Sequence, residues 1–305
     1  METFALLIAA SINAGTPLLL AALGLLINEK SGVVNLGSEG MMLVAAIVGF
    51  AATVHTGSVT LGLIAGAASG LLLAGLFAWL TVWLGANQVA TGLALSLFGT
   101  GVSAYIGINY VSKTLQNSKF SIPWLEDIPF IGTALFRQHP MVYFSILLCA
   151  AIVWFLYRSR AGLVLRAVGE SPSSAHSLGY NVRLIRLAAL LFGGACCGLA
   201  GAFLSLVYTS QWLEGMVAGR GWIALALVTF ASWRPARILV GAYLFSSVTI
   251  LTFYMQSKGV PVASQLLSML PYLATILVLV LISRNANWIK LNMPASLGKN
   301  FNPGS

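Results

Sequence analysis

The stretch TLGLIAGAASGLLLAGLFAWLTVWL, residues 60–84, decides the fold class of this chain. Its 25 residues include no charged side chain. As an α-helix the stretch would be about 38 Å long at 1.5 Å per residue. The hydrocarbon core of a bilayer is roughly 30 Å thick, so such a helix can cross it. Strands of a membrane barrel would instead alternate in polarity over about ten residues. The stretch therefore predicts a transmembrane helix.

Apolar runs of this kind recur along the whole chain. They fall at residues 4–27, 41–55, 88–108, 140–157, 187–209, 221–233, 236–256 and 268–284. The composition agrees, because hydrophobic residues make up 58% of the 305 residues, charged residues only 8%, and the mean hydropathy is +0.90. Soluble domains carry roughly a quarter charged residues. These values exclude a soluble globule and predict an all-α polytopic membrane protein with about nine transmembrane helices, within a range of eight to ten.

Two of the runs are too short to cross a bilayer alone. The runs at 41–55 and 221–233 are both preceded by closely spaced glycines. Short, glycine-interrupted apolar segments are typical of broken or re-entrant helices. We therefore expect interrupted segments near 29–43 and 211–233.

The charges indicate the orientation in the membrane. The net charge of +9 could suggest nucleic-acid binding, but the charges lie in short loops, so no nucleic acid is expected. Lysine and arginine favour the cytoplasmic side. With the arginine-rich loop 158–186 inside, 11 basic residues lie in the cytoplasm and 5 outside, which predicts an outer N-terminus and an inner C-terminus. The expected parts are a transmembrane domain at 1–284 with an outer loop at 109–139, and a polar cytoplasmic tail at 285–305 without fixed structure.

The inner loop contains signals for a short helix. Ser171 can cap its start, Pro172 suits the first helical position, and Gly179 suits a left-handed stop. A helix is therefore expected from about 172 to 178. Two roles remain open for it: a loop resting on lipid headgroups, or a docking element for a cytoplasmic partner.

Four motifs resemble a known family. They are NEKSGVVNLGSEGMML (28–43), GANQVATGLAL (85–95), AGLVLRAVGESP followed by LGYNV (161–172 and 178–182), and GRGWIALALV (219–228). In order and spacing they resemble permeases of ATP-binding-cassette (ABC) importers in the branch for branched-chain amino acids, ribose and nucleosides. The resemblance is closest to nucleoside or simple-sugar permease subunits and covers residues 10–285. Ser38 and the sequence Ser232-Trp233-Arg234-Pro235 depart from the expected pattern, which leaves the substrate open.

The resemblance implies a transport subunit in the bacterial cytoplasmic (inner) membrane that moves a nucleoside-like solute inward. The chain has no phosphate-binding P-loop, so ATP hydrolysis falls to a cytoplasmic ABC ATPase with two nucleotide sites. A second homologous permease chain, forming a heterodimer, and an extracytoplasmic solute-binding protein are the other expected partners, together with membrane lipid. No catalytic residue, metal or cofactor is expected. The residues expected to couple to the ATPase are Arg166, Val168, Gly169, Glu170, Ser171, Pro172, His176, Leu178, Gly179 and Asn181.

The residues expected along the substrate pathway are polar or aromatic groups of the motifs and of the segment before the last motif. They are Asn35, Ser38, Glu39, Asn87, Gln88, Thr91, Gln211, Trp212 and Glu214. Purely structural roles stay open for several of these residues. Glu39 could pair with Lys30 at the membrane interface, the two amides at 87–88 could cap a helix, and Trp212 could be an interfacial anchor. Amides, hydroxyls and rings suit a nucleoside, and a simple sugar would fit the same groups. A self-sufficient secondary transporter is the less favoured alternative, because only Glu39 approaches a midspan carboxylate.

Overall fold

The computed structural model describes residues 2–115, 132–259 and 292–301, with six further positions between 266 and 276. Within these residues, seven helices are long and apolar enough to cross a membrane. They are α1 (Glu2–Lys30), α2 (Ser38–Thr56), α3 (Val59–Ala78) with its π-helical continuation η1 (Trp79–Trp83), α4 (Gln88–Gly107), α5 (Pro140–Arg158), α8 (Val182–Phe203) with its continuation η4 (Leu204–Tyr208), and α10 (Pro235–Ser257). The all-α polytopic prediction is confirmed. Most of the run expected at 268–284 and most of the outer loop lie outside the described residues.

Shorter helices complete the described part of the chain. They are η2 (Ile108–Tyr110), η3 (Gly132–Phe136), α6 (Arg160–Glu170), α7 (Pro172–Ser177) and α9 (Arg220–Phe230). Many helix starts follow the usual side-chain rule, in which an oxygen or ring nitrogen accepts a hydrogen bond from a free backbone N–H of the first turn. The capping residues are Ser58, Asn87, His139, Ser159, Ser171 and Asn181.

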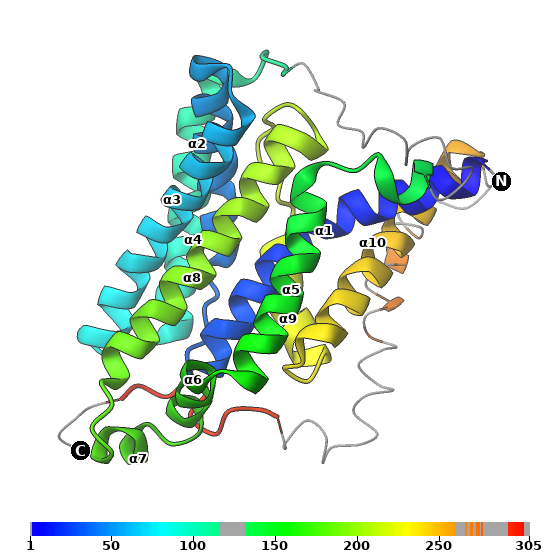
Figure 1. Cartoon of the computed structure of the whole chain (residues 1–305). Helices are drawn as coiled ribbons and strands as arrows, with labels where there is room; N and C mark the ends of the chain where they lie inside the picture. The colour runs from blue at the N-terminus through cyan, green and yellow to red at the C-terminus, as the bar shows by residue number, and fades with distance from the viewer. Residues whose placement is uncertain are drawn as a thin grey trace.

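Small residues allow the central helices to approach closely. α8 lies against α3, where Gly194 and Gly198 face Gly66 and Gly70, and a Cβ atom at any of these positions would meet atoms of the opposing helix. Helices in lipid gain association energy from such close packing rather than from the hydrophobic effect. α1, α2 and α8 form the most buried part of the bundle, and Figure 1 shows α6 and α7 gathered at the end opposite the N-terminus.

The chain leaves helical geometry at both places where interruptions were predicted. Residues 31–37, here called the re-entrant segment, join α1 to α2 and run beside α4. The N–H of Val34 donates to Oε1 of Gln88 (2.9 Å), and Oγ of Ser96 donates to the carbonyl of Leu36 (2.8 Å). Ser96 lies about 12 Å further along α4 than Gln88. The segment therefore passes into the bundle before α2 begins.

The second interruption precedes α9. Residues 209–219 are non-helical, and Ser210, Gly215, Ala218 and Gly219 have positive φ angles between 51° and 81°. α9 then has only 11 residues, too few to cross a bilayer alone. Both predicted interruptions are thus confirmed.

The expectation of a tail without fixed structure is wrong for residues 292–301. This segment, here called the C-terminal strap, lies beside α6 at the end of the molecule that carries α7, where Figure 1 shows it in red. The N–H of Gly298 donates to the carbonyl of Gly32 (3.1 Å), and Nζ of Lys30 donates to the carbonyl of Asn292 (2.8 Å). The non-helical segment after α1 has backbone groups without helical partners, and the strap supplies some of the missing partners.

Candidate functional site

The first turns of α2 and α9 meet inside the bundle. Oε1 of Glu39 accepts a hydrogen bond from the N–H of Gly219, and Oε2 accepts one from the N–H of Gly221, each at 2.7 Å. Oγ of Ser38 donates to the carbonyl of Gly221 (3.1 Å). We call this set the α2–α9 junction. A helix N-terminus has free N–H groups and a partial positive charge, so the carboxylate satisfies both.

At the α2–α9 junction, Glu39 caps the start of α9, whereas the sequence had left its role undecided. Its side chain is buried, and both oxygens bind backbone of α9, which lies about 180 residues further along the chain. Lys30, the expected partner in an interfacial pair, instead donates to Asn292. The carboxylate next to Lys30 in the sequence is Glu29, which accepts a hydrogen bond from Nε1 of Trp233.

The predicted amides of the first and second motifs are engaged within the protein. Asn35 is buried, and its Oδ1 accepts from the N–H of Gly37 (3.0 Å). Gln88 is buried between Val34 and the strap residue Asn300, to which its Nε2 donates (3.1 Å). Asn87 caps α4, and Thr91 lies half-buried one turn later. Gln88 thereby holds the re-entrant segment against α4.

The remaining pathway candidates lie at the other end of the bundle. Trp212 is buried against Gly107 of α4, and its indole N–H has no hydrogen-bond partner in the described part of the chain. Gln211 pairs with Thr114 in an isolated β-bridge, and Glu214 is exposed. The structure therefore divides the predicted pathway residues between the junction, the start of α4 and the outer end.

A partly polar cavity that the sequence did not predict lies beside the start of α9. Its volume is about 180 Å³, and its walls come from α1, η4, α9 and α10. We call it the junction cavity; its polar and aromatic lining consists of Tyr208, Arg220, Phe245, Ser246, Thr249, Thr252 and Phe253. The guanidinium of Arg220 lies 5.9 Å from the centre of the Tyr208 ring.

The hydroxyls of this cavity can still accept hydrogen bonds. Thr249 donates to the carbonyl of Phe245, Thr252 to that of Val248, and Ser246 to that of Ser11. Each hydroxyl oxygen has two lone pairs, which these bonds leave available. The signal in the sequence was the recurrence of hydroxyl residues every three positions, at 246, 249 and 252, on one face of an apolar helix.

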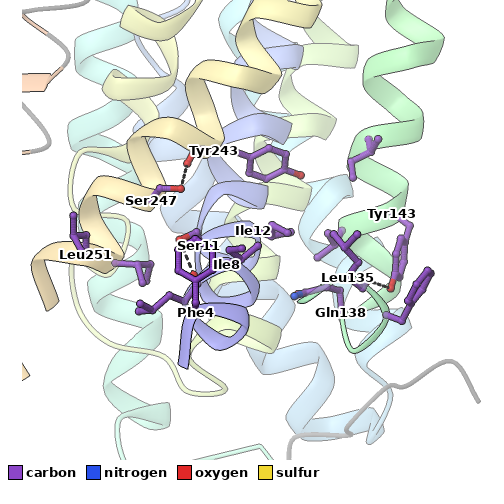
Figure 2. Close-up of a pocket in the computed structure, with 15 residues that line it drawn as sticks. Phe4, Ile8, Ser11, Ile12, Leu135, Gln138, Tyr143, Tyr243, Ser247 and Leu251 are labelled. Carbon is purple, nitrogen blue, oxygen red and sulfur yellow. Dashed lines mark hydrogen bonds between the residues drawn. The ribbon is translucent and has the colours of Figure 1, made fainter. Parts of the chain in front are cut away.

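A larger cavity near the N-terminus has a different character. It has a volume of about 710 Å³ and lies between α1, η3, α5 and α10, as Figure 2 shows. Its walls are mainly aliphatic and aromatic, and the polar side chain of Gln138 donates to the carbonyl of Ala9 while Tyr143 donates to that of Leu135. This lining suits hydrocarbon rather than a polar solute.

The predicted coupling region forms two short helices at the opposite end. Ser171 caps α7, Pro172 is at its first position, and Gly179 has a φ of 88°, as the sequence pattern predicted. The helix itself ends one residue earlier than expected, at Ser177. Leu178 is 78% exposed just after the helix. α7 therefore projects a capped turn and an apolar side chain away from the bundle.

The other coupling candidates connect α7 to the bundle. Val168 is buried with Ala175 and Val182 in a small apolar cluster. The guanidinium of Arg166 lies over the Tyr157 ring, and Asn181 caps α8. Three predicted coupling residues remain. Gly169 is buried, Glu170 ends α6, and the ring of His176 contacts that of Phe301. Among the described residues, no group of three His, Cys, Asp or Glu side chains could hold a metal ion.

A bundle of membrane-spanning helices in which two interrupted helices meet is typical of multi-pass membrane transport proteins. Residues 7–282 match the family described as "Branched-chain amino acid transport system / permease component", and the chain belongs to this family. It is an ABC transporter permease of the sugar and nucleoside type. Membership implies an ATPase and a solute-binding protein as partners, together with membrane lipid.

The curated relatives span nearly the full chain. A proposed glucose ABC transporter permease of Haloferax volcanii, TsgC13, is 40% identical over 97% of each chain. The nucleoside permease NupC of Lactococcus lactis is 32% identical over 92% of this chain and 93% of its own, and the guanosine permease NupQ of Bacillus subtilis is 30% identical over 92% of each. A second guanosine permease of B. subtilis and a second glucose permease of H. volcanii match at 27% and 22% identity. No solved structure matches the chain.

Proposed function

We propose that this chain is one permease subunit of an ATP-driven importer that moves a nucleoside-like solute into the cytoplasm. The observation that carries the proposal is the lining of the junction cavity. An aromatic ring at Tyr208 can stack on a base, hydroxyls on α10 can bond to a ribose, and Arg220 can donate to ring or carbonyl acceptors. Relatives named as nucleoside and guanosine permeases support the same solute class.

A simple sugar is the second candidate solute. The relative with 40% identity is named as a glucose permease, and hydroxyl groups would serve a sugar as well as a ribosyl group. The two candidates differ in the aromatic base. A contribution of the Tyr208 ring to recognition therefore favours the nucleoside.

The pathway residues expected from the sequence are assigned two roles in this proposal. Asn35, Ser38, Glu39, Asn87 and Gln88 hold the walls of the path, because hydrogen bonds within the protein engage them. The solute contacts residues of the junction cavity and, on its way inward, Thr91. Gln211, Trp212 and Glu214 belong to the entrance that faces the solute-binding protein.

The assembly in this proposal contains a second, different permease. Two guanosine permeases of B. subtilis both resemble this chain, as do two glucose permeases of H. volcanii. Two distinct homologous chains named for one solute support a heterodimer. A cytoplasmic ATPase with two nucleotide sites then lies below residues 158–186, and the N-terminus lies outside the bacterial cytoplasmic membrane.

Uptake by the complete reconstituted transporter tests the solute. We expect uptake of labelled guanosine or uridine to depend on ATP and to resist excess ribose or glucose. Thr249→Val, which removes one hydroxyl without changing shape much, should raise the solute concentration for half-maximal uptake. Thr56→Val at the exposed end of α2 serves as the control. ATP-driven uptake of labelled glucose that nucleosides do not suppress would overturn the nucleoside choice.

A further inference from the structure

The end of the molecule that carries α7 has a surface made from two distant parts of the chain. α7 and the turn after it form one part, and the C-terminal strap forms the other. The ring of Phe301 contacts that of His176, with centroids 5.6 Å apart, and packs on the apolar cluster of Val168, Ala175 and Val182. The exposed surface around α7 is thus continuous with the end of the strap.

A hollow lies between these two parts. Its volume is about 340 Å³, and it is lined by His176, Gly179, Tyr180, Asn181, Val182, Arg183 and Phe301. Leu178 and Tyr180 expose large apolar surfaces beside it. Arg183 lines the hollow, and residues 158–186 contain a single acidic residue, Glu170. The surface therefore fits a partner that offers an apolar side chain surrounded by acidic groups.

The strap also binds the re-entrant segment through a buried arginine. Arg186 of α8 is buried, and its guanidinium donates to the carbonyl of Ser31 (3.2 Å), the carbonyl of Lys299 (3.1 Å) and Oγ of Ser296 (3.3 Å). A buried cation is costly unless its N–H groups have acceptors. Two of these three acceptors come from the strap, so strap, re-entrant segment and α8 are held as one unit.

Further hydrogen bonds connect the strap to α6 and to the start of α4. The N–H and Oγ of Ser296 both donate to the carbonyl of Gly169 in α6, at 3.0 and 2.6 Å. The side chain of Asn300 donates to the carbonyl of Gly85 (2.6 Å) and accepts from Gln88, which in turn binds Val34. A chain of direct contacts therefore runs from α7 through the strap to residues 31–34. The re-entrant segment then leads into Ser38 and Glu39 at the α2–α9 junction.

We propose that the C-terminal strap is the second half of the ATPase-docking surface and passes the displacement of α7 to the re-entrant segment. The inference rests on the proposed function, since the partner is the transporter's ATPase. A movement of α7 shifts Phe301 and α6, and the strap is bonded to residues 31–32 through backbone groups and Arg186. The strap would thereby connect ATP-driven motion to the point where the two interrupted helices meet.

Site-directed crosslinking tests the docking half of the proposal. The three native cysteines, Cys149, Cys196 and Cys197, are free and buried, so an introduced surface cysteine can carry a thiol-reactive photocrosslinker. In the assembled transporter we expect Lys299→Cys to crosslink to the ATPase, as Ser173→Cys on α7 should. Glu214→Cys, at the opposite end, should give no such product. An adduct from Ser173→Cys without one from Lys299→Cys would overturn the docking role.

The ratio of ATP hydrolysed to solute imported tests the transmission half. Phe301→Ala and Ser296→Ala should leave the ATPase bound but raise this ratio about threefold or more, the size of effect that residues coupling two sites typically have. Met293→Ala, an exposed strap residue, is the matched control. An unchanged ratio in Phe301→Ala, which alters only the tip of the strap, would overturn the proposal. If the unmodified transporter hydrolyses no ATP during uptake, the proposed function itself fails.

Discussion

Glu39 illustrates how one buried carboxylate can join two halves of a membrane protein. Its two oxygens accept the N–H groups of Gly219 and Gly221, so the charge compensates the free N-terminus of α9. Glutamine has the same shape but only one acceptor oxygen. Glu39→Gln would therefore leave one buried N–H facing an amide NH₂.

We expect Glu39→Gln to lower the free energy of unfolding by about 1–3 kcal/mol, the usual cost of an unsatisfied buried donor. Thermal unfolding in detergent measures this loss, and uptake should fall with it. Glu214→Gln, which changes an exposed carboxylate, should leave the unfolding temperature unchanged. If Glu39→Gln abolished uptake at full thermal stability, Glu39 would instead act on the solute.

His139 makes the start of α5 sensitive to acid. Its Nδ1 accepts a hydrogen bond from the N–H of Met141 (3.2 Å), and burial lowers its pKa below the ordinary value of 6.5. The unfolded chain therefore takes up the proton at higher pH than the folded chain does. Stability from this group is present above about pH 6.5 and is lost as the pH falls through the lowered folded pKa.

Replacing His139 by asparagine should remove this part of the pH dependence. Asparagine is a good N-cap and does not titrate. We expect the wild-type unfolding temperature to fall more steeply than that of His139→Asn between pH 7.5 and 5. At pH 5 the free energies of unfolding of the two proteins should have diverged by about 0.5–2 kcal/mol, the usual contribution of a cap. Parallel curves for the two proteins would show that protonation of His139 does not affect stability.

The contact between α2 and α4 depends on glycine at selected positions. A Cβ atom on Gly99 would meet the backbone of Gly40, whereas one on Gly101 would meet nothing within 4 Å. Gly99→Ala should destabilise the protein by about 1–3 kcal/mol through overpacking. Gly101→Ala should be neutral or stabilise by up to about 1 kcal/mol. The two positions are only two residues apart in α4, so the unfolding temperatures of the two variants test the packing directly. Equal unfolding temperatures would contradict the close contact at Gly99.

Local sequence was sufficient to predict the elements but not their partners. Long apolar runs predicted the crossing helices, and glycines before short runs predicted both interruptions. The capping of α9 by Glu39 could not be predicted, because the two lie about 180 residues apart and no local pattern specifies which helix start a buried carboxylate meets. The order of residues 292–301 was missed for a similar reason, since its partners lie in α6, α8 and the re-entrant segment, far away in the sequence.

The two ends of the molecule carry different chemistry. One end holds α6, α7, the C-terminal strap and the arginines of residues 158–186. At the other end, His55 in the last turn of α2 bonds to Tyr110 in η2, and Thr114 pairs with Gln211. The positive-inside rule predicts that the α7 end lies in the cytoplasm, on the side where we propose that the ATPase binds.

Labelling of single cysteines in whole cells tests this orientation. Because the native cysteines are buried, the unmodified protein should react little with a membrane-impermeant maleimide. Glu214→Cys, exposed between η4 and α9, should be labelled in intact cells. Ser173→Cys, exposed on α7, should be labelled only after the membrane is permeabilised. Labelling of Ser173→Cys in intact cells would place α7 outside, and neither docking of a cytoplasmic ATPase on α7 nor transmission through the strap could then occur.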